Sequence, residues 1–223
     1  MNLNKSYEYF KPEAVKGTCH IIGCGSVGST VAELLARMGV REMTLYDFDK
    51  VEEHNIVNQM FTSHHIGDNK AEALREILTD INPELEDYVK VDTQGYTEDT
   101  NLNGYVFLCV DNIDLRRQIC QENMYNSQIK AVFDFRTRLE DATHYAIEWN
   151  IKGATSLIKT MNYTHEEAHE ATPVSACGIV LGVAPTVRAV CTTGVCNFIN
   201  YIKGKPLHKV VYVNPFEMRL DEL

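Results

Sequence analysis

Residues 20–29 read His-Ile-Ile-Gly-Cys-Gly-Ser-Val-Gly-Ser, a short apolar segment that enters a glycine turn. Gly23, Gly25 and Gly28 match the G-x-G-x-x-G pattern between a predicted strand over 18–23 and a predicted helix over 26–38. In this pattern the first glycine allows a tight turn, the second lets the backbone approach a phosphate, and the third lets the helix pack on the strand. A helix that begins at Ser26 offers free N–H groups to an anion. The segment therefore predicts a nucleotide-binding α/β fold, and a glycine turn without a ligand is the alternative.

An acidic residue, Asp47, ends a second predicted strand over 42–47. It follows the glycines by about 20 residues, where an acid usually binds the ribose hydroxyls of a nucleotide. A helix or turn cap is the alternative interpretation of this side chain. The glycines and Asp47 together predict a nucleotide without deciding which one, because nicotinamide-dependent oxidoreductases share them.

Predicted strands and helices alternate along most of the chain. Further strands are expected at 87–92, 105–110, 129–134, 143–149, 208–213 and 216–220, and further helices at 69–81, about 112–126, and, as one or two buried helices, 176–202. We expect residues 150–175 to be polar and irregular. This order predicts a doubly wound, Rossmann-like, mostly parallel sheet with an antiparallel C-terminal extension. No repeat or linker interrupts it, so we expect one domain over residues 1–223.

Composition excludes several classes of protein. The 223 residues are 44% hydrophobic, and their formal net charge of -10 argues against a nucleic-acid backbone as the main partner. The N-terminal residues lack the apolar core of a signal peptide, and no apolar run is long enough to span a membrane, so we expect a cytoplasmic protein. Reduced thiols fit that location, because the cysteines are odd in number and include no C-x-x-C pair. They are Cys19, Cys24, Cys109, Cys120, Cys177, Cys191 and Cys196.

A second set of polar residues has no use in a simple dehydrogenase. In chain order they are Asp49, Asn55, Gln59, Lys70 at the start of a predicted helix, and Asp111 and Asn112 at the end of a predicted strand, with Arg116 one turn on. Together with the late segment 175–183, this set resembles the adenylation domain of the ThiF/MoeB family and the ubiquitin-activating enzymes. The resemblance covers residues 17–220, nearly the whole chain.

The resemblance implies a role for each side chain. Asp47 would bind the ribose of ATP, with Asp49 in the same site. Asn55 and Lys70 would hold the phosphates, and Gln59 would support the loop that carries Asn55. Asp111 would coordinate Mg²⁺, with Asn112 beside it. Taken singly, Lys70 could be a solvated charge, Asn55 a loop residue, and Asp111 with Asn112 a helix cap.

The same resemblance implies an ATP-dependent adenylyltransferase. Such an enzyme activates the C-terminal carboxylate of a small ubiquitin-like (β-grasp) protein or peptide and releases pyrophosphate. That reaction needs charge neutralisation and in-line positioning more than an acid or a base. Relatives form homodimers, so a homodimer is expected, and the partner's tail would lie near residues 140–175 and the sheet edge.

The chain departs from the family pattern at several positions. Asn58 stands where the family usually has an arginine that binds the γ-phosphate. The family also often has an N-terminal arginine that reaches the ATP of the partner subunit, whereas the first arginine here, Arg37, lies within the first predicted helix. Candidates to replace the missing cations are Lys5, Lys11, Arg136 and Arg138. The family's zinc cysteines are also absent, so we expect no structural zinc. A catalytically weakened scaffold therefore stays open as an alternative, beside the nicotinamide oxidoreductase, which would leave Asn55, Gln59, Lys70 and Asp111 without a role.

Two late features carry open interpretations. Cys177 aligns with the cysteine that takes the activated carboxyl in some relatives, and we expect it to open a helix at 178; an inert small residue is the alternative. Residues 165–169 match H-E-x-x-H, but the segment is short, polar and closed by Pro173. A solvated loop or short helix that helps to cover the nucleotide is the interpretation we favour over a zinc peptidase.

Overall fold

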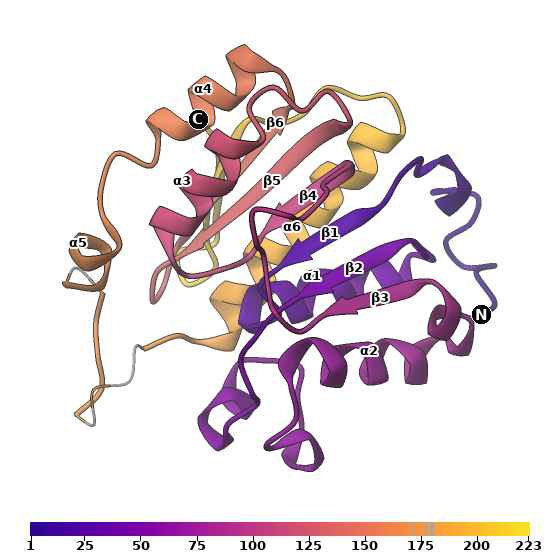
Figure 1. The fold of residues 1–223 in the computed structure, drawn as a ribbon, viewed down its shortest axis with the longest axis horizontal. Helices are drawn as coiled ribbons and strands as arrows, with labels where there is room; N and C mark the ends of the chain where they lie inside the picture. Colours follow the sequence, from indigo (N-terminus) through magenta and orange to yellow (C-terminus); the bar gives the residue numbers. More distant parts are fainter. Residues whose placement is uncertain (171, 177, 179–180) are drawn as a thin grey trace.

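Eight strands form one sheet that carries the rest of the chain (Figure 1). The computed structural model describes residues 1–170, 172–176, 178 and 181–223. Across the sheet the strands are ordered β3-β2-β1-β4-β5-β6-β7-β8. Their bounds are β1 Cys19–Ile22, β2 Met43–Tyr46, β3 Val89–Asp92, β4 Gly104–Leu108, β5 Ile129–Thr137, β6 Ala142–Glu148, β7 Val210–Asn214 and β8 Arg219–Glu222.

The strand directions confirm the predicted fold class. Strands β1 to β5 pair in parallel, whereas β6, β7 and β8 add to them in antiparallel fashion. Every residue of β4 is buried, as expected for a parallel strand covered on both faces. The chain leaves β1 towards β2 on one side, while β4 lies on its other side. Ligands of open α/β sheets bind at such a switch point, beyond the carboxyl ends of the strands.

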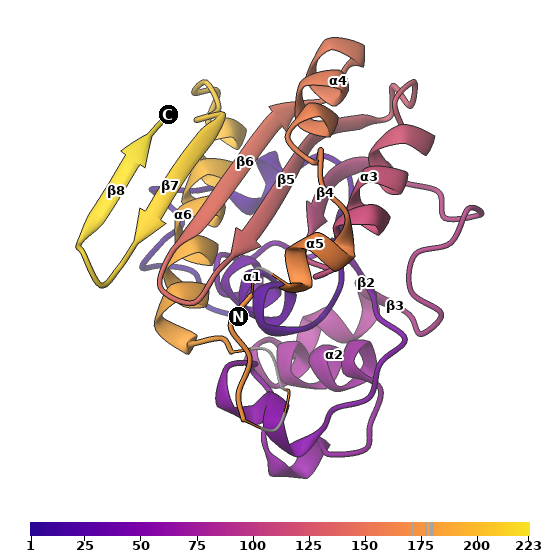
Figure 2. The same ribbon diagram turned by 90° about the vertical axis from the view of Figure 1, so that its left-hand side faces the viewer.

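Helices cover both faces of the sheet (Figure 1 and Figure 2). Helices α1, α2 and α6 pack on one face, and α3 and α4 on the other, with a separate apolar core beneath each layer. Among the described residues, no helix combines the length and apolar composition needed to cross a membrane. The helices are α1 Ser26–Arg37, α2 Lys70–Ile81, α3 Ile113–Glu122, α4 Ile151–Lys159, α5 His165–Glu170 and α6 Ala184–Ile202.

Three expectations about the helices are wrong. The stretch expected to be irregular contains α4, because Asn150 caps its first turn and Ala154 and Leu157 are buried one turn apart. Helix α6 begins at Ala184 rather than at 178, since Val183 is extended and Pro185 occupies the first turn. Helix α3 also ends earlier than expected, at Glu122.

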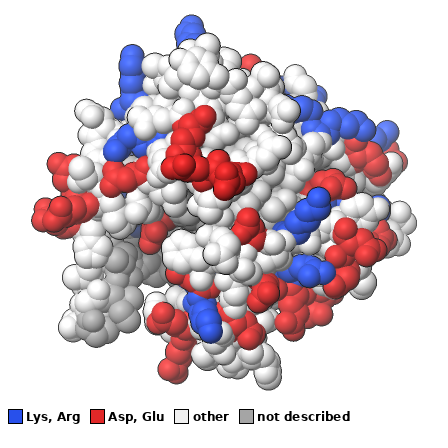
Figure 3. Space-filling model, viewed as in Figure 1, with Lys and Arg blue, Asp and Glu red and all other residues white. Residues whose placement is uncertain are grey.

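Charged side chains are mixed over the surface. On the face viewed in Figure 3, acidic side chains are spread between uncharged ones, and Lys and Arg are scattered rather than gathered in one stripe. This distribution is what the net charge of -10 leads one to expect.

One titratable group lies in the centre of the core. His144 is fully buried and stacks near Phe133 and Phe135, with ring centroids 6.1 and 4.8 Å away. The Asn197 side-chain amide lies 3.2 Å from His144 Nε2, and its orientation is set by the backbone N–H of His208, which donates to Asn197 Oδ1. Asn197 therefore donates to Nε2, so the ring is neutral with its proton on Nδ1. Burial lowers the pKa of His144 to about 4 from an ordinary value of 6.5.

This burial predicts acid sensitivity. Between pH 6.5 and 4 the unfolded chain binds a proton at residue 144 that the folded chain refuses, so the free energy of unfolding falls as pH falls. The contribution lost by pH 4.5 is about 2–3 kcal/mol. Urea unfolding from pH 7 to 4.5 should show a shallower pH dependence for His144→Gln than for wild type. The exposed control His64→Gln should keep the wild-type slope, and an unchanged slope for His144→Gln would contradict the prediction.

Candidate active site

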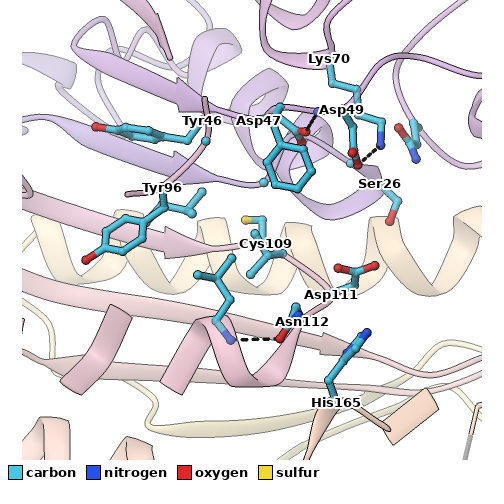
Figure 4. Close-up of a pocket in the computed structure, with 18 residues that line it drawn as sticks. Ser26, Tyr46, Asp47, Asp49, Lys70, Tyr96, Cys109, Asp111, Asn112 and His165 are labelled. Atoms are coloured by element: carbon cyan, nitrogen blue, oxygen red, sulfur yellow. Dashed lines mark hydrogen bonds and ion pairs between the residues drawn. The ribbon is translucent and has the colours of Figure 1, made fainter. Parts of the chain in front are cut away.

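A cavity of about 330 Å³ opens at the carboxyl ends of β1, β2 and β4 (Figure 4). The structure brings nine of the predicted site residues together on its wall. From the glycine turn and β2 they are Gly23, Gly25, Ser26, Asp47 and Asp49, and from later elements Gln59, Lys70, Asp111 and Asn112. Strands that are far apart in sequence thus deliver one site, at the switch point that the sheet order defines.

The three glycines of the turn have different steric surroundings. Gly23 has a φ of 91°, and a Cβ there would lie 2.8 Å from the backbone N of Val110. A Cβ on Gly28 would lie 1.8 Å from the carbonyl O of Gly23, so Gly28 packs behind the turn and does not line the cavity. At Gly25, by contrast, the nearest atom to an added Cβ would be Gln59 Nε2, at 3.9 Å. Gly25 is therefore the position where the backbone stays open to the cavity.

The first turn of α1 faces the same space. Gly25 is its N-cap and provides no side-chain acceptor, so the first N–H groups of the helix are available to a ligand. The macrodipole adds a positive partial charge at this end. Nearby, Gln59 Oε1 is buried without a hydrogen-bond partner among the described residues. The free N–H groups at the helix end are suited to an anion, and that oxygen is suited to a hydrogen-bond donor.

Asp47 is held at the end of β2 by backbone donors. Its Oδ2 accepts from the N–H of Cys24 at 2.6 Å, and its Oδ1 accepts from the N–H of Asp49 at 2.9 Å. Burial raises the pKa of this carboxyl, and the two hydrogen bonds oppose that rise. Each oxygen keeps a lone pair for a further donor, as a ribose diol would require.

Asn69 explains why Lys70 reaches the cavity. Its side-chain oxygen caps α2 by accepting from the N–H groups of Ala71 and Glu72, and its amide donates to the carbonyl O of Asp47 at 2.9 Å. The start of α2 is thereby tied to the end of β2. Lys70 Nζ, which is mostly buried, then forms an ion pair with Asp49 at 3.0 Å.

Asp111 and Asn112 have different surroundings: Asn112 is a helix cap, whereas Asp111 faces the cavity. Asn112 caps α3, since its Oδ1 accepts from the N–H groups of Asp114 and Leu115 at 2.9 and 3.0 Å. Asp111 is exposed in the cavity, and its carboxylate makes no hydrogen bond or ion pair with the described residues. Arg116 holds this strand end in place by donating to the carbonyl O atoms of Leu108, at 3.1 Å, and Val110.

Some predicted residues are placed elsewhere. Asn55 is buried in the short 3-10 helix Glu53–Val57, where its Oδ1 accepts from the N–H of Glu52 at 2.9 Å, and it does not line the cavity. Cys177 lies outside the described residues. The H-E-x-x-H segment forms α5, and the described residues contain no group of three or more His, Cys, Asp or Glu placed to hold a metal ion.

The four candidate replacement cations do not line the cavity. Arg136 instead pairs with the buried Asp134 at 2.7 Å, and Arg138 lies near Asp141 at 3.7 Å. Lys11 Nζ lies over the ring of Tyr7. Arg136 and Arg138 therefore do not supply positive charge to this cavity, and a role for Lys5 or Lys11 stays a prediction. Lys5 likewise lies off the cavity wall.

Several lining residues escaped the sequence analysis. They supply an apolar and aromatic part of the wall and include Tyr46, Phe48, Tyr96, Cys109 and Leu115. Phe48 is 69% exposed at the end of β2, and its place in the sequence between Asp47 and Asp49 is the signal for it. Tyr96 comes from a loop, where no periodicity indicates direction. His165 belongs to the H-E-x-x-H segment, which was expected to form a loop or short helix over the nucleotide, and it lines this cavity from the short helix α5. An aromatic wall beside polar groups is suited to a flat base such as adenine.

A second cavity, of about 730 Å³, lies beside β5 and β6. Its wall includes Arg136, Arg138, Tyr163 and Glu167. It therefore coincides with the region from 140 to 175 where a partner's tail is expected. The segment from Thr160 to Ala168 contributes to both cavities, because His165 lines the first one.

The sheet order, the glycine turn and the open helix end define a Rossmann-like nucleotide-binding protein. Within that class the model of the ThiF family matches residues 13–211, so the chain belongs to the ThiF family. It is 34% identical over 148 residues to "Ubiquitin-like modifier-activating enzyme 5" of Drosophila virilis, which is 56% of this chain and 35% of that protein. The corresponding protein of Drosophila persimilis is 33% identical over the same length. The chain thus spans about a third of the length of these relatives.

Solved structures share the fold at low identity. Escherichia coli MccB with MccA-N7isoAsn superposes with a TM-score of 0.73 at 16% identity, covering 94% of this chain and 65% of MccB. PaaA superposes with a TM-score of 0.69 at 18% identity, covering 95% and 65%. E. coli MccB with ATP gives a TM-score of 0.66 at 18% identity, again covering 95% and 65%. These structures confirm the Rossmann-like architecture.

The glycine geometry predicts two contrasting variants. Gly28→Ala should lower the free energy of unfolding by several kcal/mol, about 2–4, because helix and strand must separate to admit the methyl group. Gly25→Ala should fold with nearly wild-type stability but bind ATP at least about tenfold more weakly, since its methyl group occupies the phosphate approach. Urea unfolding and calorimetric titration with ATP check both. Equal effects of the two variants on stability would show that this assignment is mistaken.

Proposed function

We propose that residues 1–223 form one adenylation domain with ATP-dependent adenylyltransferase activity. It activates the C-terminal carboxylate of a small ubiquitin-like (β-grasp) protein or a peptide as an acyl-adenylate. The observation that carries this proposal is one cavity shared by an open helix N-terminus, Lys70 and the uncommitted Asp111 carboxylate. Family membership, the activating-enzyme relatives, and a structural neighbour solved with ATP support it.

The lining residues suit the parts of ATP. Asp47 would accept from the ribose hydroxyls, while the aromatic wall would contact the base. The N–H groups at Ser26 and the Lys70 ammonium would bind phosphate oxygens, and Asp49 would hold Lys70 towards them. Asn55 stays a predicted phosphate ligand that the cavity does not support, because it is buried off the cavity wall and its Oδ1 accepts within the helix cap.

Asp111 would hold Mg²⁺ in this scheme. Mg²⁺ typically takes one or two protein carboxylates and completes its shell with water and substrate phosphates. A single free carboxylate at the strand end, beside Asn112, fits that donor set. When bound, the ion would neutralise phosphate charge. We expect no zinc, as the sequence indicated.

The chemistry follows from positioning. A carboxylate oxygen of the partner attacks the α-phosphorus, the bond to the bridging oxygen breaks, and pyrophosphate leaves with the electron pair. No proton needs to move, so the site contributes alignment and charge stabilisation.

The second cavity would receive the partner's tail, since the segment 160–168 borders both cavities. A covalent role for Cys177, a homodimer and a cytoplasmic location belong to this proposal.

The other candidate functions are less well supported. A nicotinamide oxidoreductase would use the glycines and Asp47 but leave Lys70 and Asp111 in the same cavity without a role. A scaffold that has lost activity is compatible with Asn58, which stands where the family usually has an arginine. The Asn58 side-chain Nδ2 instead donates to the carbonyl O of Gly182 at 3.5 Å. ATP–pyrophosphate exchange separates the adenylyltransferase from the other two, because only the adenylyltransferase supports it.

Asp111→Asn should lower ATP–pyrophosphate exchange at least about a hundredfold, because it removes the carboxylate that would hold the metal. The assay uses the purified chain with Mg²⁺ and candidate partners, including small proteins that co-purify and peptides ending in Gly-Gly. Asp99→Asn, an exposed acid away from the cavity, should exchange at the wild-type rate. The proposal fails if no partner supports exchange and Asp111→Asn binds magnesium ATP as tightly as wild type.

A further inference from the structure

The H-E-x-x-H segment gives its two histidines different environments. His165, the first residue of α5, lines the ATP cavity, and Figure 4 shows its ring directed into the cavity near Asp111 and Asn112. Its Nδ1 is buried and has no hydrogen-bond partner among the described residues. His169, one turn later, is exposed and lines neither cavity. A buried, unpaired nitrogen at a cavity wall calls for a partner that a ligand can supply.

The backbone that carries His165 is fastened to α3. The N–H of His165 donates to Asp114 Oδ2 at 3.0 Å, and this bond holds the pKa of Asp114 below its ordinary value. Arg117 donates to the carbonyl O of Met161 at 3.0 and 2.6 Å and to that of Tyr163. Arg117 also pairs with Asp114 at 2.8 Å. We call these two side chains, Asp114 and Arg117, the α3 latch.

Among the described residues that line the cavity, acidic side chains outnumber basic ones. Asp47, Asp49 and Asp111 face Lys70, whose ammonium already pairs with Asp49. Lys70 and His165 are the two basic side chains among the described lining residues. A triphosphate carries several negative charges, so each further hydrogen-bond donor on this wall stabilises it.

We propose that His165 donates a hydrogen bond from Nδ1 to a phosphate oxygen of bound ATP, and that the α3 latch positions it to do so. This inference rests on the proposed function, because it takes ATP as the occupant of the cavity. His165 contacts the nucleotide, whereas Asp114 and Arg117 are positioning residues. The two residues of the α3 latch lie in the first turns of α3, which begins directly after Asp111 and Asn112. The same helix therefore holds both His165 and the strand end that carries Asp111, the proposed metal ligand.

Calorimetric titration tests the histidine with two probes, the non-hydrolysable analogue AMPCPP with Mg²⁺, and adenosine. His165→Ala should weaken AMPCPP binding about tenfold, the usual worth of one hydrogen bond to a charged group, and change adenosine binding less than about twofold. His165→Asn places an amide N–H where Nδ1 lies and should restore the affinity to within about threefold. His165→Gln mimics Nε2 and should not. His169→Ala is the matched control and should bind like wild type.

A second set of variants tests the latch. Asp114→Ala should weaken AMPCPP binding in the wild-type background and have no further effect in His165→Ala, because both changes remove the same contact. Asp114→Asn keeps an acceptor for the His165 N–H and should remain close to wild type. Thermal unfolding of each variant reports whether α3 itself has loosened.

Several outcomes would overturn the inference. They are unchanged AMPCPP affinity in His165→Ala, equal losses for AMPCPP and adenosine, rescue by Gln rather than Asn, and additive losses in the double variant. If wild type binds AMPCPP but His165→Ala binds it equally well, only this inference fails. If wild type binds no triphosphate, the proposed function fails and this inference fails with it.

Discussion

A buried carboxylate, Asp134 on β5, is the constraint on which both cavities depend. In the interior, Arg116 pairs with its Oδ1 and Arg136 with its Oδ2. Arg116 also satisfies the carbonyls at the end of β4, and Arg136 donates to the backbone and hydroxyl oxygens of Thr160, both at 2.8 Å. Removing one partner of such a buried pair typically costs about 3–5 kcal/mol, because a charge is left unpaired. The network therefore connects the end of β4, where Val110 lines the first cavity, to Thr160, which lines the second cavity.

The chain places its chemical groups on the ends of rigid elements. Asp47 ends β2, Asp111 follows β4, and Lys70 begins α2. Asn69 caps α2 and donates to the carbonyl O of Asp47 at the end of β2, and Asn112 caps α3 directly after Asp111. The segment from Thr160 to His165 is held by side chains of other elements: Arg136 at Thr160, Arg117 at Met161 and Tyr163, and Asp114 at His165. A reaction that depends on alignment benefits from this rigidity.

Hydrophobic periodicity predicted the positions of the strands along the chain well. A buried parallel strand is a short apolar run, so it can be identified from its own residues. It missed α4, whose buried face is narrow, and placed the start of α6 too early, where Pro185 and an extended Val183 decide the first turn. Most polar residues of the site were found because, in chain order, they resemble the ThiF/MoeB pattern, and several of them lie at strand ends and helix starts. Tyr96 was missed, since a loop carries no such signal, whereas the segment that begins with His165 was expected to help to cover the nucleotide. Asn55 was found as a residue but lies off the cavity wall.

By itself the sequence determined the doubly wound sheet, the glycine turn and the set of polar groups at the carboxyl ends of the strands. These features depend on local sterics and on hydrophobic patterning, which one chain segment expresses alone. Only the tertiary structure decided that Arg136 is committed to Asp134, that the Asp111 carboxylate has no hydrogen-bond or ion-pair partner among the described residues, and that a histidine from α5 joins the first cavity. Those facts depend on contacts between residues far apart in sequence, and whether a side chain is free or paired is settled only when the layers pack.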